Sequence, residues 1–481
     1  MIRSILPPLA AGLLLLAGCG GDGYEPEIRD KEKRLGAEQH PQLLAEFGGD
    51  YRGPEAEYAR RVGQKVATAA GLEGECTFTL VNSDVVNAFA VPGCYVYVTR
   101  GLMGIVNSEA ELASVLAHEV GHIVAAHNRR QRNRSLWRSL AVWAVGTVTG
   151  SEDLSRIAGR AAEYFTLRYS RKQEYEADDL GVRFLAAAGY DPWAASDMLG
   201  ALGRHEQYMG RTRGRDEARA IPEWARTHPL AGNRVERAAQ AAAATGIADG
   251  TLPELEIPYL RELDGLLYGD DPAQGFVAGR RFAHPVMRIG FEAPPGFTLT
   301  NSPQAIMIEG PDGLRGEFGG NAMPPGGLAA YAEGLIRTLL KDAPAQAGPA
   351  EPTVINGLPA LLVPVVVRTE QGAVELTIAA YDGGDGGAYH FIMVGPPAEA
   401  SRSAIAALFA SFHLLSDEEA RSLRPRVIRT VRVGLGQTPT TLAGFMASDH
   451  PLDHFLMLNG LSPGAAPKPG ELVKIVTFAP R

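Results

Sequence analysis

The sequence has few cysteines, no strongly basic segment and no long apolar run. Its three cysteines allow at most one intrachain disulfide. No apolar stretch reaches the roughly 20 residues that a transmembrane helix needs, so no membrane-spanning helix is predicted. The formal net charge is −9 and the pI is near 5.7, which argues against nucleic acid as a partner because nucleic-acid-binding domains carry a basic patch. No tandem repeat is visible.

The length and composition indicate a folded protein of several domains. At 481 residues the chain is too long for one ordinary hydrophobic core, which predicts about two to four domains. Hydrophobic residues make up 45% and charged residues 21% of the chain, as in ordinary globular proteins.

The first 18 residues have the pattern of a targeting signal. Arg3 supplies a positive charge, residues 5–16 are apolar, and the segment ends in Leu-Ala-Gly before Cys19. This ending resembles the lipobox of bacterial lipoproteins, in which the cysteine becomes the lipidated first residue after cleavage. The alternative is an ordinary secretory signal with an incidental cysteine.

Lipidation of Cys19 would anchor the protein to a membrane without spanning it. Gly20 rather than Asp follows Cys19, which by resemblance to enterobacterial sorting rules favours the outer membrane, on the periplasmic side of the envelope. An oxidising compartment also permits a disulfide between Cys76 and Cys94. The sequence leaves that bridge and two buried free thiols equally open.

Changes in residue composition and in hydrophobic pattern divide the rest of the chain into segments. The expected segments are a tether (19–50), a mainly helical domain with a small β-sheet (51–250), a linker (251–279), an α+β domain (280–416) and a small βααβ unit (426–478). The fold class is therefore α+β.

The helical domain contains a metal-binding pattern. A helix is predicted from the S-x-x-E capping pattern at Ser108 and Glu111 to about Arg130. It carries the HExxH sequence His118-Glu119-Val120-Gly121-His122. Residues four apart share one helix face, so both imidazoles can bind one Zn²⁺, and Glu119 lies beside the open position as general base for the metal-activated water.

A zinc site of this kind takes a third protein ligand. A metzincin would have histidine at position 128, but that residue is Asn128, which excludes this class. Glu174 and Asp178 lie four apart on a second predicted helix, so one can bind zinc while the other orients an imidazole. The residues alone do not decide between them, and a solvated acidic helix face is the alternative.

Four ordered motifs between about residues 50 and 245 carry a family resemblance. They are NAFAVPG at 87–93 with VTRGL at 98–102, HEVGH at 118–122, EYEAD at 174–178, and THP at 227–229 followed by Arg234. Together they resemble the HtpX/BepA-like zinc metalloendopeptidases, family forty-eight of the metallopeptidases, to which the CAAX prenyl protease is a distant relative. The resemblance implies a zincin-type domain with one Zn²⁺ per chain.

The resemblance also implies roles for individual residues. Glu174 matches the third metal ligand, and Asp178 matches the carboxylate behind the ligands. His228 matches a histidine that either polarises the substrate carbonyl or occupies the water position at rest, and Arg234 is its basic companion. The residues matched to the edge strand that receives an extended substrate are Asn87, Ala88, Phe89, Ala90 and Val91.

Three further features of the sequence concern the same helical domain. Cys94 stands where the family usually has a second glycine. His127 lies nine residues beyond His118 on the same predicted helix and is expected to be structural. Residues 136–148 form either a lid over the cleft or an ordinary core helix.

The remaining segments carry weaker signals. The last unit contains Gly436, Thr438, a Leu-Asn-Gly-Leu run at 458–461 and a Pro-Gly-Glu-Leu-Val run at 469–473. It resembles a LysM module, a peptidoglycan-binding fold, but Gln437 stands where the pattern commonly has Asp. Glycan binding and a degenerate module that only packs on its neighbour therefore stay open. The α+β domain has no catalytic constellation, and its histidines are isolated: His284, His390 and His413.

The sequence thus predicts a zinc endopeptidase of the bacterial cell envelope that acts on misfolded or mis-assembled envelope proteins. The alternative is a largely latent peptidase that serves as an assembly factor or as a peptidoglycan-associated scaffold. The complete set of ligand and base residues favours the enzyme. The sequence does not determine the substrate or the oligomeric state.

Overall fold

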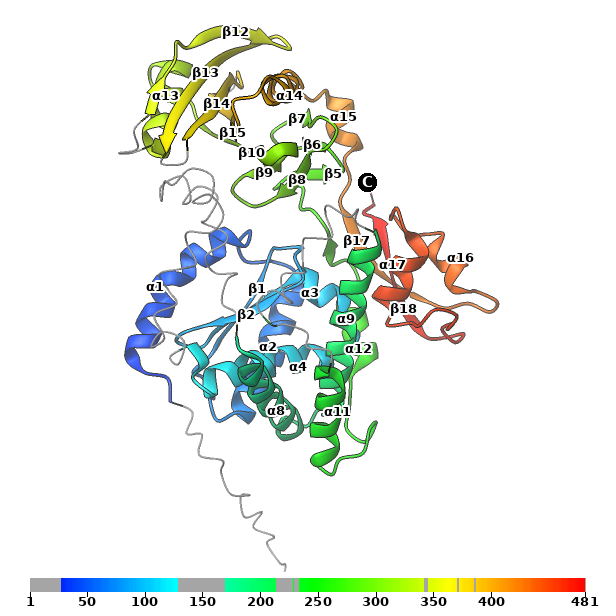
Figure 1. Cartoon of the computed structure of the whole chain (residues 1–481). Coiled ribbons are helices and arrows are strands. Elements are labelled where there is room, and N and C mark those ends of the chain that lie inside the picture. The colour runs from blue at the N-terminus through cyan, green and yellow to red at the C-terminus, as the bar shows by residue number, and fades with distance from the viewer. Residues whose placement is uncertain are drawn as a thin grey trace, which may run out of the picture.

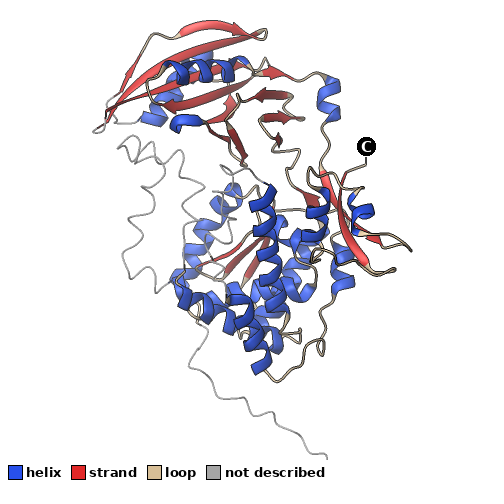
Figure 2. Cartoon of the chain, turned by 45° about the vertical axis from the view of Figure 1, so that its right-hand side comes forward, coloured by secondary structure: helices blue, strands red, loops and turns tan. Residues whose placement is uncertain are grey.

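A computed structural model describes residues 27–128, 169–212, 228, 233–340, 345–369, 372–384 and 386–480. The predicted signal peptide with Cys19 and the predicted lid or core helix at 136–148 lie outside these residues. Within them, a helical part comes first and a strand-rich part follows, and the C-terminal unit lies beside the helices (Figures 1 and 2).

The helical part surrounds a three-stranded sheet and a buried helix. The strands are β1 (Thr77–Val81), β2 (Ala88–Val91) and β3 (Tyr95–Thr99), in the spatial order β1-β3-β2. The helices are α2 (Pro54–Ala69), α3 (Arg100–Ile105), α4 (Glu109–Val124), α8 (Arg171–Ala187), α9 (Ala194–Thr212) and α11 (Arg234–Ala244). Almost every residue of α4 is buried, which makes α4 the centre of this part.

Strand β2 forms one edge of the sheet. It pairs antiparallel with β3, which in turn runs parallel to β1. Because side chains alternate along a strand, Ala88 and Ala90 face the main core while Val91 packs on the opposite face with Val81 and Tyr97. The predicted strand at 87–91 is present, and it lies where an added strand could pair with it.

The tether predicted at 19–50 is wrong for its second half. Residues Asp30–Glu46 form helix α1, and α1 covers the outer face of the sheet (Figure 1). Leu43 is fully buried there, and His40 Nδ1 lies 2.7 Å from the Tyr97 hydroxyl oxygen. Burial of apolar side chains against the sheet overrides the polar composition that suggested a tether.

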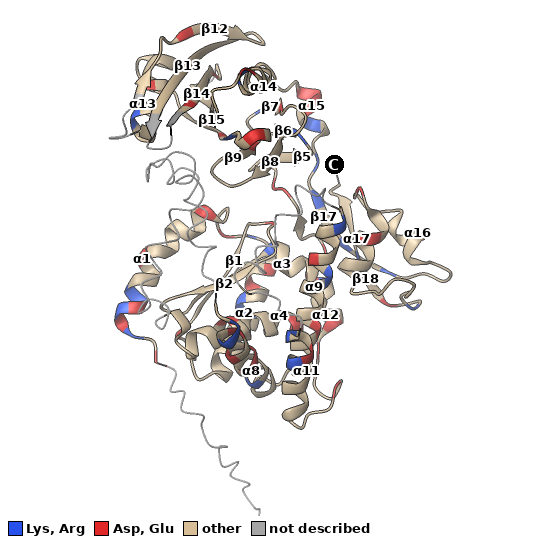
Figure 3. Cartoon of the chain, viewed as in Figure 1, with Lys and Arg blue, Asp and Glu red and all other residues tan. Residues whose placement is uncertain are grey.

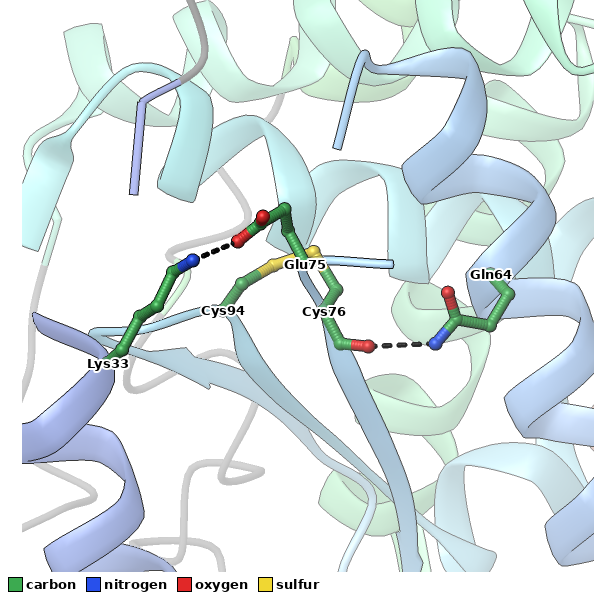
Figure 4. Close-up of a disulfide and its surroundings, with 5 residues drawn as sticks. All are labelled: Lys33, Gln64, Glu75, Cys76 and Cys94. Atoms are coloured by element: carbon green, nitrogen blue, oxygen red, sulfur yellow. Dashed lines mark hydrogen bonds and ion pairs between the residues drawn. A yellow bond between two sulfur atoms is a disulfide. The ribbon is translucent and has the colours of Figure 1, made fainter. Parts of the chain in front are cut away.

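The structure joins Cys76 and Cys94 in a disulfide (Figure 4). Their Cα atoms lie 4.7 Å apart, because β1 and β3 are neighbours and the two cysteines stand at the same end of the pair. Cys94 has a φ of 59°, in the left-handed region that glycine tolerates best. This explains why glycine suits the position, as the family resemblance suggested.

The linker predicted at 251–279 is largely part of the helical core. Helix α12 (Glu256–Glu262) and the turn after it bury Tyr259, Leu263 and Leu266 in the same cluster as α4. The Tyr259 hydroxyl donates to the Met103 carbonyl at 2.7 Å. Strand β4 (Leu267–Tyr268) then pairs with the C-terminal unit. Tyr259, Leu263 and Leu266 recur at helical spacing, which is a signal in the sequence for a buried helix rather than a linker.

The strand-rich part contains two antiparallel sheets. One consists of β5 (Phe276–Ala278), β6 (Arg281–His284), β7 (Ile289–Glu292) and β16 (His413–Leu414). The other consists of β8 (Thr298–Asn301), β9 (Ile306–Glu309), β10 (Arg315–Ala322), β11 (Ala345–Ala347), β12 (Glu351–Ile355), β13 (Leu358–Thr369), β14 (Gly372–Asp382) and β15 (Gly387–Gly395). Helices α13 (Gly327–Leu340) and α14 (Glu399–Ala410) pack on opposite faces of the larger sheet.

The C-terminal unit has the predicted order of strand, helix, helix, strand. Its elements are β17 (Arg426–Arg432), α16 (Pro439–Ala443), α17 (Pro451–Leu458) and β18 (Leu472–Phe478), and a short helix α15 (Asp417–Ser422) precedes them. β17 pairs with both β18 and β4. The core residues Ile428, Phe455 and Val476 belong to the same buried cluster as α4, so this unit is docked on the helical part.

No helix within the described ranges is both long and apolar enough to cross a bilayer. Acidic and basic residues occur together on the same elements, as on α1 and α8 (Figure 3).

Candidate metal centre

Helix α4 presents His118 and His122 from a capped N-terminus. Ser108 Oγ accepts a hydrogen bond from the Glu111 N–H at 3.0 Å. The Glu111 carboxylate accepts a hydrogen bond from the Asn107 N–H at 2.9 Å. In a regular capping box it would accept from the N–H of the N-cap residue, Ser108. The cap fixes where the helix begins, and the two histidines then lie one turn apart on the same face.

Two glycines allow the ligand-bearing helices to cross closely. A Cβ atom at Gly121 would lie 2.9 Å from the Ala177 carbonyl oxygen, and one at Gly181 would lie 3.3 Å from the His118 main-chain nitrogen. Larger side chains would push α8 away from α4. Gly121, inside the HExxH sequence, therefore helps to bring Glu174 within reach of both histidines.

The side chains of His118, His122, Glu174 and His228 converge on one buried point. The Nε2 atoms of His118 and His122 are 3.0 Å apart. Each lies 3.6 Å from an oxygen of Glu174. His228 Nδ1 lies 3.2 Å from His118 Nε2 and 3.1 Å from Glu174 Oε1. Three of these groups are the predicted ligands, and His228 is the fourth donor.

This donor set fits a tetrahedral metal ion. Zinc binds imidazole nitrogen and carboxylate oxygen at about 2.0–2.2 Å, which places neighbouring ligand atoms about 3.4 Å apart. The separations of 3.0 to 3.6 Å agree with that value. A metal cation would accept lone pairs from all four of these buried groups at once.

Glu119 is buried beside this group. Its carboxylate oxygens have no hydrogen-bond partner among the described residues, and Oε1 lies 3.5 Å from His228 Nε2. Burial raises the pKa of Glu119 to about 8, and the negative charge of Glu174 adds to the shift while His118 opposes it. A buried carboxylate next to a metal position is the arrangement that a general base requires.

Asp178 and Arg234 lie behind the ligands. His118 Nδ1 is 2.9 Å from Asp178 Oδ1, and Arg234 donates to both Asp178 oxygens at 2.9 and 2.7 Å. Arg234 Nη1 also lies 2.8 Å from Glu174 Oε2. Although burial opposes the charged form, these neighbours keep the pKa of Asp178 well below its ordinary value. Arg234 therefore holds two acidic side chains in place, whereas the sequence analysis grouped it with the catalytic residues.

The predicted substrate strand borders the site. α4 packs directly against β2, and Asn128 Nδ2 donates to the Ala90 carbonyl oxygen of β2 at 3.4 Å. Asn87, which precedes the strand, is buried and pairs through its backbone with Thr99. Of the residues matched to the substrate strand, Ala88 to Val91 form β2 itself.

Sequence reasoning missed two side chains at the site. The Tyr169 ring stacks on His122 with centroids 3.8 Å apart, and its hydroxyl donates to Asn128 Oδ1 at 2.7 Å. His127 contacts His122 directly. No motif marked Tyr169. His127 was noticed, but it was expected to be structural rather than part of the site.

Comparison with known proteins agrees with this geometry. Residues 54–242 match the family model described as "Peptidase family M48". The chain is 34% identical over 176 residues to the mitochondrial metalloendopeptidase OMA1 of Arabidopsis thaliana, covering 36% of this chain and 33% of that protein. It is 30% identical over 192 residues to the beta-barrel assembly-enhancing protease of Yersinia pestis, covering 38% of each.

The matched region defines the class of the site. Residues 54–242 carry an M48 metalloendopeptidase site whose metal-binding residues are the buried His118, His122 and Glu174. The match spans less than half of this chain and about a third of those two relatives' length. Among solved structures, the cyanobacterial PsbP of Synechocystis is 16% identical and covers 30% of this chain and 98% of its own, with a TM-score of 0.23.

Proposed function

We propose that this protein is a zinc-dependent endopeptidase of the bacterial cell envelope that cleaves misfolded or mis-assembled envelope proteins. The observation that carries the proposal is the convergence of His118, His122 and Glu174 beside the buried carboxylate of Glu119. The name of the Yersinia relative, a beta-barrel assembly-enhancing protease, supports an envelope substrate.

The proposed chemistry assigns one proton-transfer role to Glu119. A zinc ion held by the three ligands would polarise the scissile carbonyl and acidify a water molecule. Glu119 would take a proton from water as the water oxygen bonds to the carbonyl carbon, and would return it to the amine nitrogen as the C–N bond breaks. His228, whose Nε2 lies 3.5 Å from Glu119 Oε1, would donate to the carbonyl oxygen as it becomes negative during the attack of water on the carbonyl carbon.

The substrate is proposed to bind as an extended strand along the free edge of β2. Such β-addition needs main-chain groups that are not used by a neighbouring strand, and β2 pairs with β3 on one side only among the described strands. The substrate backbone would then run past α4, which packs against β2 and carries Glu119.

The alternative proposal is a largely latent peptidase that serves as an assembly factor or scaffold. Its support is the position of His228, whose Nδ1 lies 3.1–3.2 Å from a glutamate oxygen and a histidine nitrogen of the ligand set. An imidazole there fills the fourth ligand position of a tetrahedral site. His228 would then have to move aside before the protein could cleave anything.

The location of the protein is part of the same proposal. We place it at the periplasmic side of the envelope, anchored by a lipid on Cys19, at the outer membrane. Only ten residues separate Cys19 from Asp30, where α1 begins, and they reach at most about 36 Å when fully extended. The active site would therefore work close to the membrane. The LysM-like unit is a proposed contact with peptidoglycan.

Two variants test the enzymatic proposal in the full-length protein. Wild-type protein should contain about one zinc per chain and degrade an unfolded protein such as casein. Glu119→Gln should keep the zinc and lose cleavage by a thousandfold or so, whereas Glu174→Ala should lose most of the zinc. A Glu119→Gln protein that still restores a deletion strain would favour the scaffold instead.

A further inference from the structure

His127 lies beside the metal-binding histidines because the ligand helix stops early. α4 ends at Val124, and Ala126 has a φ of 53°, so the helix predicted to continue to about Arg130 is interrupted. On an unbroken helix His127 would lie about 140° around the axis from His122. The left-handed turn at Ala126 instead folds the fully buried His127 back towards His122.

The contacts of His127 form a continuous chain. His127 Nδ1 lies 2.8 Å from His122 Nδ1, and His127 Nε2 lies 3.1 Å from Glu176 Oε2 on α8. His122 directs its other nitrogen, Nε2, at His118 and Glu174. The two imidazoles thus lie in a row of contacts that runs from the metal position to the Glu176 carboxylate.

The row determines where the protons are. A neutral imidazole that offers Nε2 to a metal carries its proton on Nδ1. His122 Nδ1 therefore donates, and His127 Nδ1 accepts. His127 must then carry its own proton on Nε2, which donates to Glu176. The structure offers one consistent assignment for both rings.

The two metal-binding histidines are supported in different ways. His118 faces the carboxylate of Asp178 directly, and Arg234 offsets that charge. Beside His122 the direct contact is instead His127. A neutral imidazole supplies the acceptor there, and the carboxylate of Glu176 stands farther out with its side chain 21% exposed. This arrangement avoids another buried negative charge next to Glu119 and Glu174.

We propose that His127 is a positioning residue that holds the His122 imidazole in the tautomer and orientation required for metal binding, with Glu176 holding His127 in turn. The proposal deepens the proposed metallopeptidase function and rests on it. The HExxH sequence does not include either residue. Groups that orient a metal-binding histidine typically contribute 10- to 100-fold to metal affinity or activity.

The test measures zinc affinity of the full-length protein by competition with a chelator, together with the absorption spectrum of the Co²⁺-substituted protein. His127→Leu removes the acceptor and should weaken zinc binding about 10- to 100-fold. His127→Asn places an amide oxygen close to the position of Nδ1, and should stay within a few-fold of wild type with an unchanged Co²⁺ spectrum. Glu176→Leu should weaken binding by a smaller factor than His127→Leu, and Glu176→Gln, which keeps an acceptor oxygen, by less still.

A matched control separates positioning from general destabilisation. His390→Leu also removes a buried histidine, one that contacts Tyr331 in the strand-rich part, and should lower thermal stability without changing zinc affinity. Wild-type affinity in His127→Leu, or equal losses in His127→Leu and His127→Asn, would overturn the proposal. If His127→Leu does not fold, the difference between Glu176→Leu and Glu176→Gln decides. Failure of the wild type itself to bind zinc would instead refute the proposed function.

Discussion

Lys474, in the last strand of the chain, donates a hydrogen bond from its buried ammonium group to the main-chain oxygen of Val106 at 2.7 Å, across 368 residues of sequence. It also donates to the Gly104 oxygen at 2.9 Å. Gly104 lies in the last turn of α3 and Val106 directly follows that helix, two residues before the N-cap of α4. Burial lowers the pKa of Lys474 to about 7, and the nearby Glu111 opposes that shift. The C-terminal unit is thus fastened to the start of the helix that carries the metal site.

Replacing Lys474 should destabilise the protein. Lys474→Met leaves two buried carbonyl oxygens and the Glu111 carboxylate without their cationic neighbour, and we expect a loss of about 3–5 kcal/mol in the free energy of unfolding. The double variant Lys474→Met/Glu111→Gln should recover part of that loss. Urea unfolding measures both. Lys468→Met, which removes an exposed lysine from the same unit, should change little, and an equal effect of the two single variants would contradict this interpretation.

His454 should make the docking of the C-terminal unit sensitive to acid. It lies buried against the Tyr268 hydroxyl at 2.7 Å, and its Nδ1 has no hydrogen-bond partner among the described residues. Burial lowers the pKa of His454 to about 3, and the charges of Arg426 and His205 add to this. The folded state therefore binds fewer protons than the unfolded state, so this stability is complete above about pH 6.5 and is lost as the pH falls towards 3.

The expected loss from His454 between about pH 6.5 and pH 4.5 is about 2 kcal/mol. His454→Gln keeps an acceptor for the Tyr268 hydroxyl but does not titrate, so its unfolding free energy should depend less on pH over this range. Chemical unfolding at several pH values is the measurement. His450→Gln, at an exposed histidine just before α17, is the control, and identical pH profiles for the two variants would refute the assignment.

The backbone at Cys94 should prefer glycine once the disulfide is absent. Cys76→Ala/Cys94→Gly and Cys76→Ala/Cys94→Ala both lack the bridge and should be less stable than the oxidised wild type by about 3 kcal/mol. Because the φ of 59° at position 94 strains a residue with a Cβ atom, the glycine variant should be more stable than the alanine variant by about 1 kcal/mol. Urea unfolding compares them, and a more stable alanine variant would contradict this prediction.

Tyr169 should affect substrate binding more than metal binding. Tyr169→Phe keeps the ring on His122 but removes the hydrogen bond to Asn128, which in turn contacts the Ala90 carbonyl of β2. We expect KM for a peptide substrate to rise about fivefold, as for the loss of one buried hydrogen bond, with zinc content and kcat little changed. Tyr175→Phe removes a comparable bond to Asn233 on the exposed surface and should leave KM unchanged. A fall in kcat without a change in KM would refute this role.

The metal ligands could be predicted because their pattern is local. His118 and His122 are one helical turn apart, and Glu174 and Asp178 repeat that spacing on α8. The spacing alone could not show which of Glu174 and Asp178 binds the metal and which orients a histidine, since both carboxylates share one helix face. Packing decides it: Glu174 reaches the histidine nitrogens, while Asp178 is held behind them by Arg234.

Other parts were mispredicted because their conformation depends on partners far away in sequence. Residues 30–46 look like a polar tether, but they form α1 because Leu43 is buried against the sheet. Residues 251–279 look like a linker, but Tyr259 and its apolar neighbours pack on the core around α4. In both cases a few buried side chains outweigh the composition of the whole segment.

By itself, the sequence determined the helical HExxH pattern, the second acidic helix, the strand at 87–91 and the strand-helix-helix-strand order of the C-terminal unit. These features follow from helix and strand periodicity and from capping, which act between residues a few positions apart. Only the tertiary structure decided that His127 supports His122, that Tyr169 stacks over it, and that Lys474 reaches Val106. Each of those contacts depends on a turn or on the packing of distant elements, and local sequence patterns do not specify these.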